Sequence, residues 1–178
     1  MSSFKEIVTK AVIGKAKKTS GNTFSLEPEE IPNTVLGCWV INHKFNGTKG
    51  SSGKVIVNGS FDVNVWYSYN GDKSTAVTTR NFTYSDTMNI PLKEDHNLAD
   101  ASEIIVRCLR QPTVSNVNVE GTTVKLDIEK ELGVEIVGDT KVKVSVEDDE
   151  DDYEEIFDES DESVLDEINE DYLNEASN

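Results

Sequence analysis

The chain has 178 residues and a formal net charge of −17, and most of this charge lies at one end. Residues 1–146 contain all 17 Lys and Arg residues and half of the 34 Asp and Glu residues, so this body is formally neutral, whereas residues 147–178 hold the other acids and no basic residue. A neutral body with an acidic tail lacks a phosphate-neutralising face, so no nucleic-acid partner is expected. About 146 residues suffice for one domain of typical size or two small ones.

The expected compartment follows from the apolar segments. The longest apolar run, Val35 to Ile41, is far shorter than the roughly 20 residues that span a bilayer. Residues 4–18 interrupt their apolar positions with Lys and Glu, unlike the continuous core of a signal peptide. No membrane insertion is therefore expected, and a cytosolic location would keep Cys38 and Cys108 reduced.

The composition of the body predicts an all-β fold. Residues 1–146 contain 19 Val, 10 Ile and 14 Thr against 7 Leu and 5 Ala, and β-branched side chains favour strands whereas Leu and Ala favour helices. We therefore expect an antiparallel β-sandwich-like body, which could consist of two small β modules. A disordered acidic tail with room for one short helix would follow it.

One long strand is the clearest element of the first half. The Pro-containing residues 21–33 and the Gly- and Ser-rich residues 46–54 are typical of loops. Apolar and polar residues alternate over 55–69, which predicts one long strand or two strands joined by a bulge at Gly59. The expected apolar face consists of Val55, Val57, Phe61, Val63, Val65, Tyr67 and Tyr69.

The second half follows a charged connection. Residues 91–102 are typical of a loop that could hold one short helix. The expected organisation is a first β module at 1–92, an acidic linker at 93–102, a second β module at 103–146 and the tail at 147–178. Apolar residues that alternate along the second module, and therefore need a covering sheet, are Val124, Leu126, Ile128, Leu132, Val134 and Ile136, and then Val142, Val144 and Val146.

Three dipeptides predict tight antiparallel hairpins. Asn70-Gly71 lies between two alternating runs, Glu120-Gly121 lies between two strand-like segments, and Gly138-Asp139 separates residues 135–137 from 141–146. Each pair combines residues that tolerate the positive φ angles of a short hairpin turn.

The acidic tail admits two interpretations. A dense block of Asp and Glu repels itself and stays extended, so one interpretation is a solvated tail that provides solubility. The other is a short linear motif that folds on a partner, because the apolar residues of the tail are grouped at spacings that a helix would bring to one face. The candidate partner-binding residues are Ile156, Phe157, Leu165, Ile168, Tyr172 and Leu173.

The candidate catalytic, metal-binding and cofactor-binding segments do not match the patterns that these functions require. The glycine-rich residues 47–54 lack the spacing of a phosphate-binding loop and precede a strand where such a loop would precede a helix. His43 fits a hydrogen-bonded sheet or interface residue, and neither Cys38 nor Cys108 has a Cys-x-x-Cys partner. The tail acids lack the ligand spacing of a calcium loop. No enzyme, metal site or cofactor is therefore expected.

Several strings point to a known family. KEIVTKAV at 5–12, NTVLGCWVINHKF at 33–45, FDVNVWYSY at 61–69, LRQP at 109–112, EIVGDTKV at 135–142 and DEINEDYL at 166–173 occur in this order. This series closely resembles the outer spore-coat morphogenetic protein CotE family of endospore-forming bacteria. The most specific of these elements are NHKF and NVWYSY.

The resemblance implies a structural scaffold without enzymatic activity. Proteins of this family are made in the mother-cell cytoplasm, multimerise around the developing spore and recruit outer-coat proteins onto a basement layer organised by a morphogenetic ATPase. The expected partners are thus other copies of the chain, spore-coat proteins and that ATPase, and the expected final location is the outer coat.

The body is expected to assemble through strand edges or apolar faces. The residues that we assign to the core or to an assembly face are Trp39, His43, Phe61, Val63, Val65, Trp66 and Tyr67. An alternative from another class is an acid-tailed β-sandwich chaperone that binds basic client proteins. Both functions need the acidic tail, but only the scaffold needs the body to self-assemble.

Overall fold

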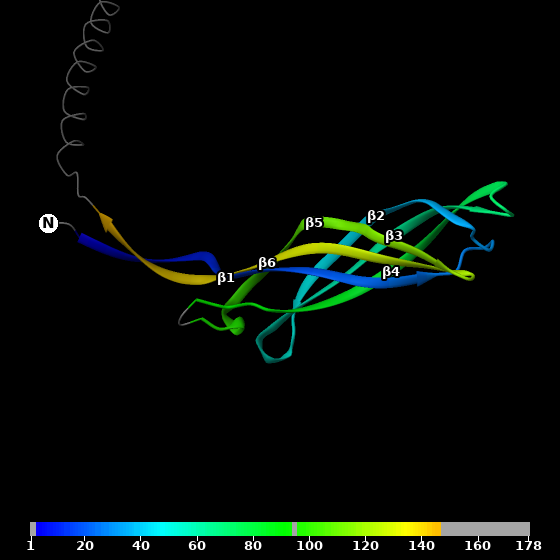
Figure 1. Cartoon of the computed structure of the whole chain (residues 1–178). Coiled ribbons are helices and arrows are strands. Elements are labelled where there is room, and N and C mark those ends of the chain that lie inside the picture. The colour runs from blue at the N-terminus through cyan, green and yellow to red at the C-terminus, as the bar shows by residue number, and fades with distance from the viewer. Residues whose placement is uncertain (1–2, 94–95, 147–178) are drawn as a thin grey trace, which may run out of the picture. The chain divides into compact units, whose positions relative to one another are not determined.

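The computed structural model describes residues 3–93 and 96–146, and their regular elements are six β-strands and two short 3₁₀ turns. The chain divides into two compact units, residues 9–140 and the residues on either side of them. The strands, labelled in Figure 1, are β1 (Ser3–Leu26), β2 (Thr34–Lys49), β3 (Lys54–Tyr69), β4 (Ser74–Asn89), β5 (Ala101–Glu120) and β6 (Thr123–Val146). The 3₁₀ turns are η1 (Ser51–Gly53) and η2 (Leu98–Asp100).

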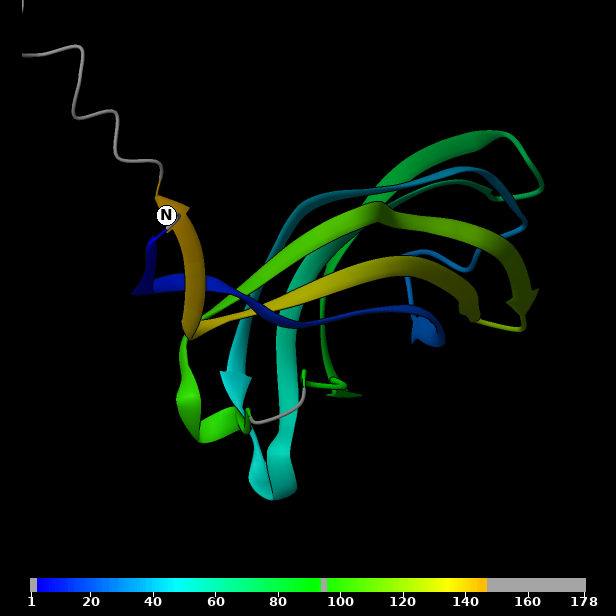
Figure 2. The same cartoon turned by 90° about the vertical axis from the view of Figure 1, so that its left-hand side faces the viewer.

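The strands form two three-stranded sheets. Their orders are β1-β6-β5 and β2-β3-β4, so β6 and β3 are the central strands. Within residues 9–140 the two sheets lie over one another as two layers (Figure 2). The pairs β2–β3, β3–β4 and β5–β6 are antiparallel. The predicted all-β, antiparallel sandwich-like fold is confirmed for the described residues.

The core lies between the inner faces of the two central strands. The apolar face predicted for β3 is buried from Val55 to Tyr67, and the face predicted for β6 is buried from Val124 to Ile136. Apart from Ile13 of β1, the largest fully buried side chains therefore come from these two strands, which belong to different sheets. Sheet β1-β6-β5 draws on both predicted modules, since β1 precedes residue 92. The division at 93–102 stays a prediction, and it overlaps the connection between β4 and β5 and the first two residues of β5.

Gly59 lies inside one uninterrupted strand, so β3 needs no bulge there. The register between β3 and β4 has no shift from Lys54 to Tyr69. Gly59 instead leaves room for the ring of Tyr84 on β4, because a Cβ at residue 59 would overlap that ring. The bulge near this point is in β2, where the register shifts between Ile41 and Lys44 and Asn42 has a φ angle of 55°.

Two of the three predicted hairpins are confirmed and the third is wrong. β3 and β4 join through residues 70–73, where Asn70 and Gly71 have positive φ angles, and β5 and β6 join through residues 121–122, where Gly121 has a positive φ angle. At Gly138-Asp139 no turn forms, because β6 continues to Val146. β6 can stay paired over this extension, because its neighbour β1 is equally long, at 24 residues.

The two strand ends outside residues 9–140 form the second unit. In this unit the described residues are 3–8 of β1 and 141–146 of β6. Val142 and Val144 are 40% and 39% exposed, so the prediction that a sheet covers this apolar set is wrong. Phe4, Lys5, Glu6 and Lys143 line a hollow in this unit.

The predicted loops are shorter than expected, because strands enter them from both sides. β1 extends to Leu26 and β2 to Lys49, which leaves 27–33 and a tight turn at 50–53. The short helix expected within 91–102 is the single 3₁₀ turn at Leu98–Asp100. Within the described ranges, no helix is long and apolar enough to span a membrane.

Replacing Gly59 by Ala tests the close approach of Tyr84. Gly59→Ala should lower the free energy of unfolding by about 1–3 kcal/mol, because the added methyl group would overlap the Tyr84 ring. Gly37→Ala is the matched control in the neighbouring strand, since its Cβ would meet the Trp66 ring at an ordinary 3.7 Å. Urea denaturation of both variants measures the difference. Equal stabilities of the two variants would contradict the packing described for Gly59.

Candidate assembly surfaces

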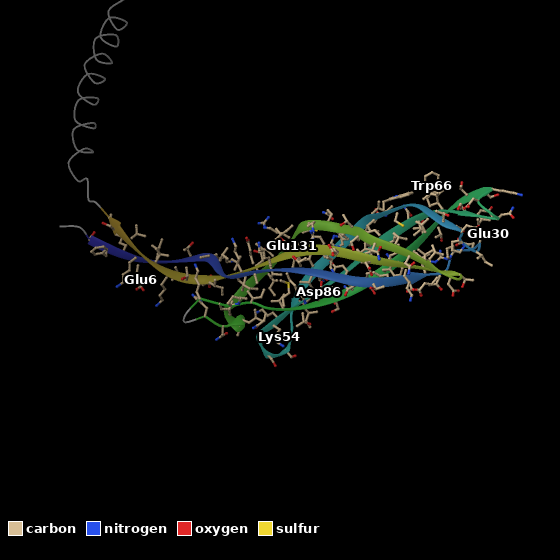
Figure 3. All side chains as sticks on the ribbon, in the orientation of Figure 1. Glu6, Glu30, Lys54, Trp66, Asp86 and Glu131 are labelled. Atoms are coloured by element: carbon tan, nitrogen blue, oxygen red, sulfur yellow. The ribbon has the colours of Figure 1, made fainter. Side chains whose placement is uncertain are left out.

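Two exposed tryptophans mark the outer face of sheet β2-β3-β4. Trp66 on β3 lies opposite Gly37 on β2 and Val77 on β4. A Cβ at Gly37 would lie 3.7 Å from the Trp66 ring and 3.8 Å from the Trp39 ring, so the two rings border the gap that this glycine leaves. Both tryptophans are 43% exposed, and Figure 3 shows Trp66 projecting from the ribbon.

Further exposed apolar side chains extend this surface. Ile41 shares the face of Trp39, two residues further along β2, and Val77 is more than half exposed. We call Trp39, Ile41, Trp66 and Val77 the tryptophan patch. Exposed aromatic side chains grouped on one face are typical of protein–protein contacts, where Trp often contributes most of the affinity.

A groove crosses the outer face of the other sheet. Its volume is about 420 Å³, and its lining includes Gly133 of β6 and Leu109 of β5. The side chains that give the groove its charge are Lys15, Lys17, Arg107 and Glu135. An excess of cations beside an apolar side chain is complementary to an acidic peptide that carries an apolar residue.

A buried ion pair joins the two sheets. Lys130 of β6 and Asp86 of β4 approach to 3.0 Å, and their side chains are only 3% and 11% exposed. Lys130 also donates a hydrogen bond to Ser20 Oγ at 3.0 Å, and Ser20 donates to Asp86 at 3.3 Å. The Lys130 ammonium lies 3.8 Å from the centre of the Tyr84 ring, which adds a cation–π contact.

The network continues from Tyr84 through the partly buried His43 to the exposed Gln111 of β5. The Tyr84 hydroxyl lies 2.7 Å from His43 Nε2, and His43 Nδ1 lies 3.4 Å from Gln111 Oε1. A neutral imidazole with its proton on Nδ1 satisfies both contacts, since Nε2 then accepts from the tyrosine. Burial lowers the pKa of His43, and the Lys130 charge lowers it further. Burial and the Asp86 charge raise the pKa of Tyr84.

This network has a structural role. It uses side chains from β1, β2, β4, β5 and β6, so it ties both sheets together. Among the described residues, no buried side-chain nitrogen or oxygen lacks a hydrogen-bond partner, and no three His, Cys, Asp or Glu side chains form a group that could hold a metal.

The structure places the predicted site residues in three groups. Phe61, Val63, Val65 and Tyr67 are buried on the inner face of β3, whereas Trp39 and Trp66 are exposed on the outer face. His43 is hydrogen-bonded between the sheets. The candidate partner-binding residues Ile156, Phe157, Leu165, Ile168, Tyr172 and Leu173 lie outside the described residues.

Sequence reasoning missed the polar core. Lys130 falls on the same alternating parity as Ile128 and Leu132, and this was the available signal that its side chain points inward. Asp86 likewise shares the parity of Tyr84 and Met88, which are buried on β4. No pattern in the sequence links these two charged residues, because their contact depends on how the two sheets pack.

A comparison with known protein families agrees with the family resemblance that the sequence motifs indicated. The model for outer spore coat protein E, CotE, matches residues 3–175. The chain belongs to the CotE family. No curated protein and no solved structure matched the chain. Membership implies a morphogenetic role in the outer spore coat, and CotE is a structural family that is not known for enzymatic activity.

Removing one partner of the buried ion pair should be costly. Lys130→Met leaves the Asp86 carboxylate buried without its cation, which should lower the free energy of unfolding by about 3–5 kcal/mol. The double variant Lys130→Met/Asp86→Leu should recover most of this loss, because no buried charge remains. Lys125→Met, which breaks the exposed pair with Glu120, is the control and should cost at most about 1 kcal/mol. Chemical denaturation that gave Lys130→Met and Lys125→Met the same stability would refute this view.

His43 should make the fold sensitive to acid. Because its folded pKa is lowered, the unfolded chain binds a proton at this ring more readily than the folded protein does. Stability should be unaffected by His43 above its unfolded pKa of about 6.5 and should fall as the pH drops below that value. His43→Gln, which stays neutral, should reduce the loss of Tm between pH 7 and pH 5. Thermal unfolding at both pH values measures this, and an unchanged loss in the variant would contradict it.

Proposed function

We propose that this chain is a self-assembling scaffold of the outer spore coat. In this proposal it is made in the mother-cell cytoplasm, multimerises around the developing spore, and recruits outer-coat proteins onto a basement layer organised by a morphogenetic ATPase. The observation that carries the proposal is the family match over residues 3–175. This match supports the coat role, and the mother-cell origin and the basement layer with its ATPase are what resemblance to the family implies. The contacts for self-association and recruitment are inferred from the surfaces and charges of the chain.

The body supplies surfaces suited to self-association. Residues 1–146 are formally neutral, so copies of this part can approach without a net repulsion. The tryptophan patch offers an apolar face, and each three-stranded sheet ends in open edge strands. An extended array needs each copy to make at least two different contacts, because a single two-fold contact stops at a pair. A face and an edge meet this need.

The tail supplies the proposed recruitment function. Its acidic residues keep it in water, and its grouped apolar residues can seat in a groove of a client protein. Within an assembled array, many copies of the tail would lie close together. Individually weak contacts with a client then gain from multivalency, because the second and later contacts form at a high local concentration.

Separating recruitment from assembly tests the proposal. Replacing Leu165, Ile168 and Tyr172 together by Ala should reduce binding to spore-coat proteins at least tenfold, because a helical motif loses its apolar anchors. Self-association of the same variant, followed by light scattering against concentration, should equal that of the parent. Asp166→Asn/Glu167→Gln/Asp171→Asn is a matched control that removes charge from the same segment and keeps the anchors.

Three results would count against this function. A parent chain that stays monomeric at high concentration would refute the scaffold. A triple Ala variant that binds coat proteins as the parent does would refute the linear motif. Binding that is lost in the charge-removing control alone, and that falls steeply with salt, would favour the chaperone for basic clients.

A further inference from the structure

Strand β4 is an edge strand that lacks the usual protection of a sheet edge. It spans 16 residues, pairs with β3 without a register shift, and contains neither Gly nor Pro. Its outer-face residues are all exposed and none is charged: Thr75, Val77, Thr79, Asn81, Thr83, Ser85, Thr87 and Asn89. Natural proteins commonly block such edges with charges, prolines, bulges or a covering element, because an open edge recruits another strand.

The other edge strands of the two sheets carry these protections. β2 has two register shifts and β5 has four. β5 also contains Pro112, together with Arg107 and Arg110 among its charged residues. β1 carries the charged residues Lys5, Glu6, Lys10, Lys15, Lys17 and Lys18. Each of the other three edges thus carries register shifts, a proline or several charged residues, whereas β4 has a regular register and an uncharged outer face.

Hydrogen bonds fix which backbone groups of β4 point to the free edge. The carbonyls of Ser68 and Lys54 on β3 accept from Asn33 and Gly50, on the side where β2 lies. Neighbouring residues of a strand point their backbone groups to opposite sides, so the odd-numbered residues of β3 face β4. Their partners in β4 are even-numbered, as in the pair Phe61 and Phe82. The odd-numbered residues of β4 thus present their N–H and C=O groups to the free edge.

Side chains already occupy two of these free-edge carbonyls. Arg80 donates to the Thr79 carbonyl at 2.9 Å, and Lys18 of β1 donates to the Thr87 carbonyl at 3.3 Å. Between them lie the outward-facing groups of Asn81, Thr83 and Ser85. This stretch is symmetric about Thr83, and a two-fold axis that pairs a strand with a copy of itself needs such symmetry.

We propose that two copies of the chain pair through the edges of β4, antiparallel and with a two-fold axis at Thr83. This inference rests on the proposed self-assembly and names one of its contacts. Thr83 then faces Thr83 of the second copy, and Asn81 faces Ser85 of the second copy. Facing residues of this kind exchange two hydrogen bonds each, so three pairs give about six. The two three-stranded sheets join into one continuous sheet.

The side chains beside this contact suit a second copy of the same strand. Thr, Ser and Asn side chains placed opposite one another can hydrogen-bond, and Thr strongly favours strands. Like charges directly opposite would repel, but the outer face of β4 has none. Because the contact is isologous, it joins copies in pairs and leaves the tryptophan patch on the outer face of each joined sheet free for another contact.

Charge swaps at residue 83 of the full-length chain test both the edge and the axis. Thr83→Lys and Thr83→Glu should each weaken pairwise association at least tenfold, because each puts like charges opposite one another across the two-fold axis. An equimolar mixture of the two variants should restore association, since the lysine of one variant then faces the glutamate of the other. Thr48→Lys and Thr48→Glu are the controls: Thr48 is exposed on the same sheet face of the opposite edge strand, β2. Both controls should associate as the parent does.

Sedimentation velocity measures association, and circular dichroism checks that each variant is folded. Amide hydrogen exchange at Asn81, Thr83 and Ser85 should be slower in the associated parent than in Thr83→Lys. A parent that does not associate would refute the scaffold itself. A parent that associates while the Thr83 variants also associate normally, or while the Thr48 variants weaken equally, would overturn the β4 contact and leave the scaffold standing. Weakened single variants that the mixture does not restore would overturn the axis at Thr83.

Discussion

The buried Lys130–Asp86 ion pair constrains how the two sheets pack. Taking a lysine and a carboxylate out of water costs several kcal/mol per ion, and only close contact and further hydrogen bonds offset that cost. Ser20 and the Tyr84 ring supply these contacts. A shift of β4 or β6 by one residue would turn one of the two charges to the outside and leave the other alone in the core. The pair therefore favours one register and one packing of the sheets over their neighbours, although apolar residues in its place could give equal stability.

Two features of sheet β2-β3-β4 place Tyr84 and His43 beside the ion pair. Gly59 lets the Tyr84 ring lie against β3, where the ring contacts Lys130 and the hydroxyl contacts His43. The bulge at Asn42 changes which residues of β2 point inward: Cys38 and Val40 pack on the core before it, and Phe45 packs there after it. His43 reaches the Tyr84 hydroxyl because of that change. A regular β2 would reverse the alternation at His43 and break the polar chain from Lys130 to Gln111.

The same features separate what the sequence could predict from what it could not. β3 and the first part of β6 lie at the centres of their sheets and alternate without interruption, so their buried faces are readable from residue type alone. In β2 the alternation of inward and outward residues shifts at Leu36 and again at Asn42. Each bulge reverses which residues point inward, so a period-two pattern does not identify the buried face of this strand. Gly138-Asp139 has the residues of a turn, but a turn forms only where the chain has no better partner, and β1 provides one. The contact between Lys130 and Asp86 is tertiary, since the two residues lie far apart in the sequence and no local pattern records it.

A scaffold needs a rigid unit as much as it needs adhesive surfaces. Each contact in a repeating array is copied many times, so a small uncertainty in the register of an edge strand would be multiplied across the array. The buried network fixes β4 relative to the opposite sheet through Asp86 and Tyr84. Thr83, Ser85 and Thr87 are the sequence neighbours of these two residues, and their backbone groups form the free edge. The inner face of β4 therefore holds the strand in one register while its outer edge stays open. A polar core that adds little net stability can still be useful here, because it holds in one register the edge through which we propose that copies of the chain pair.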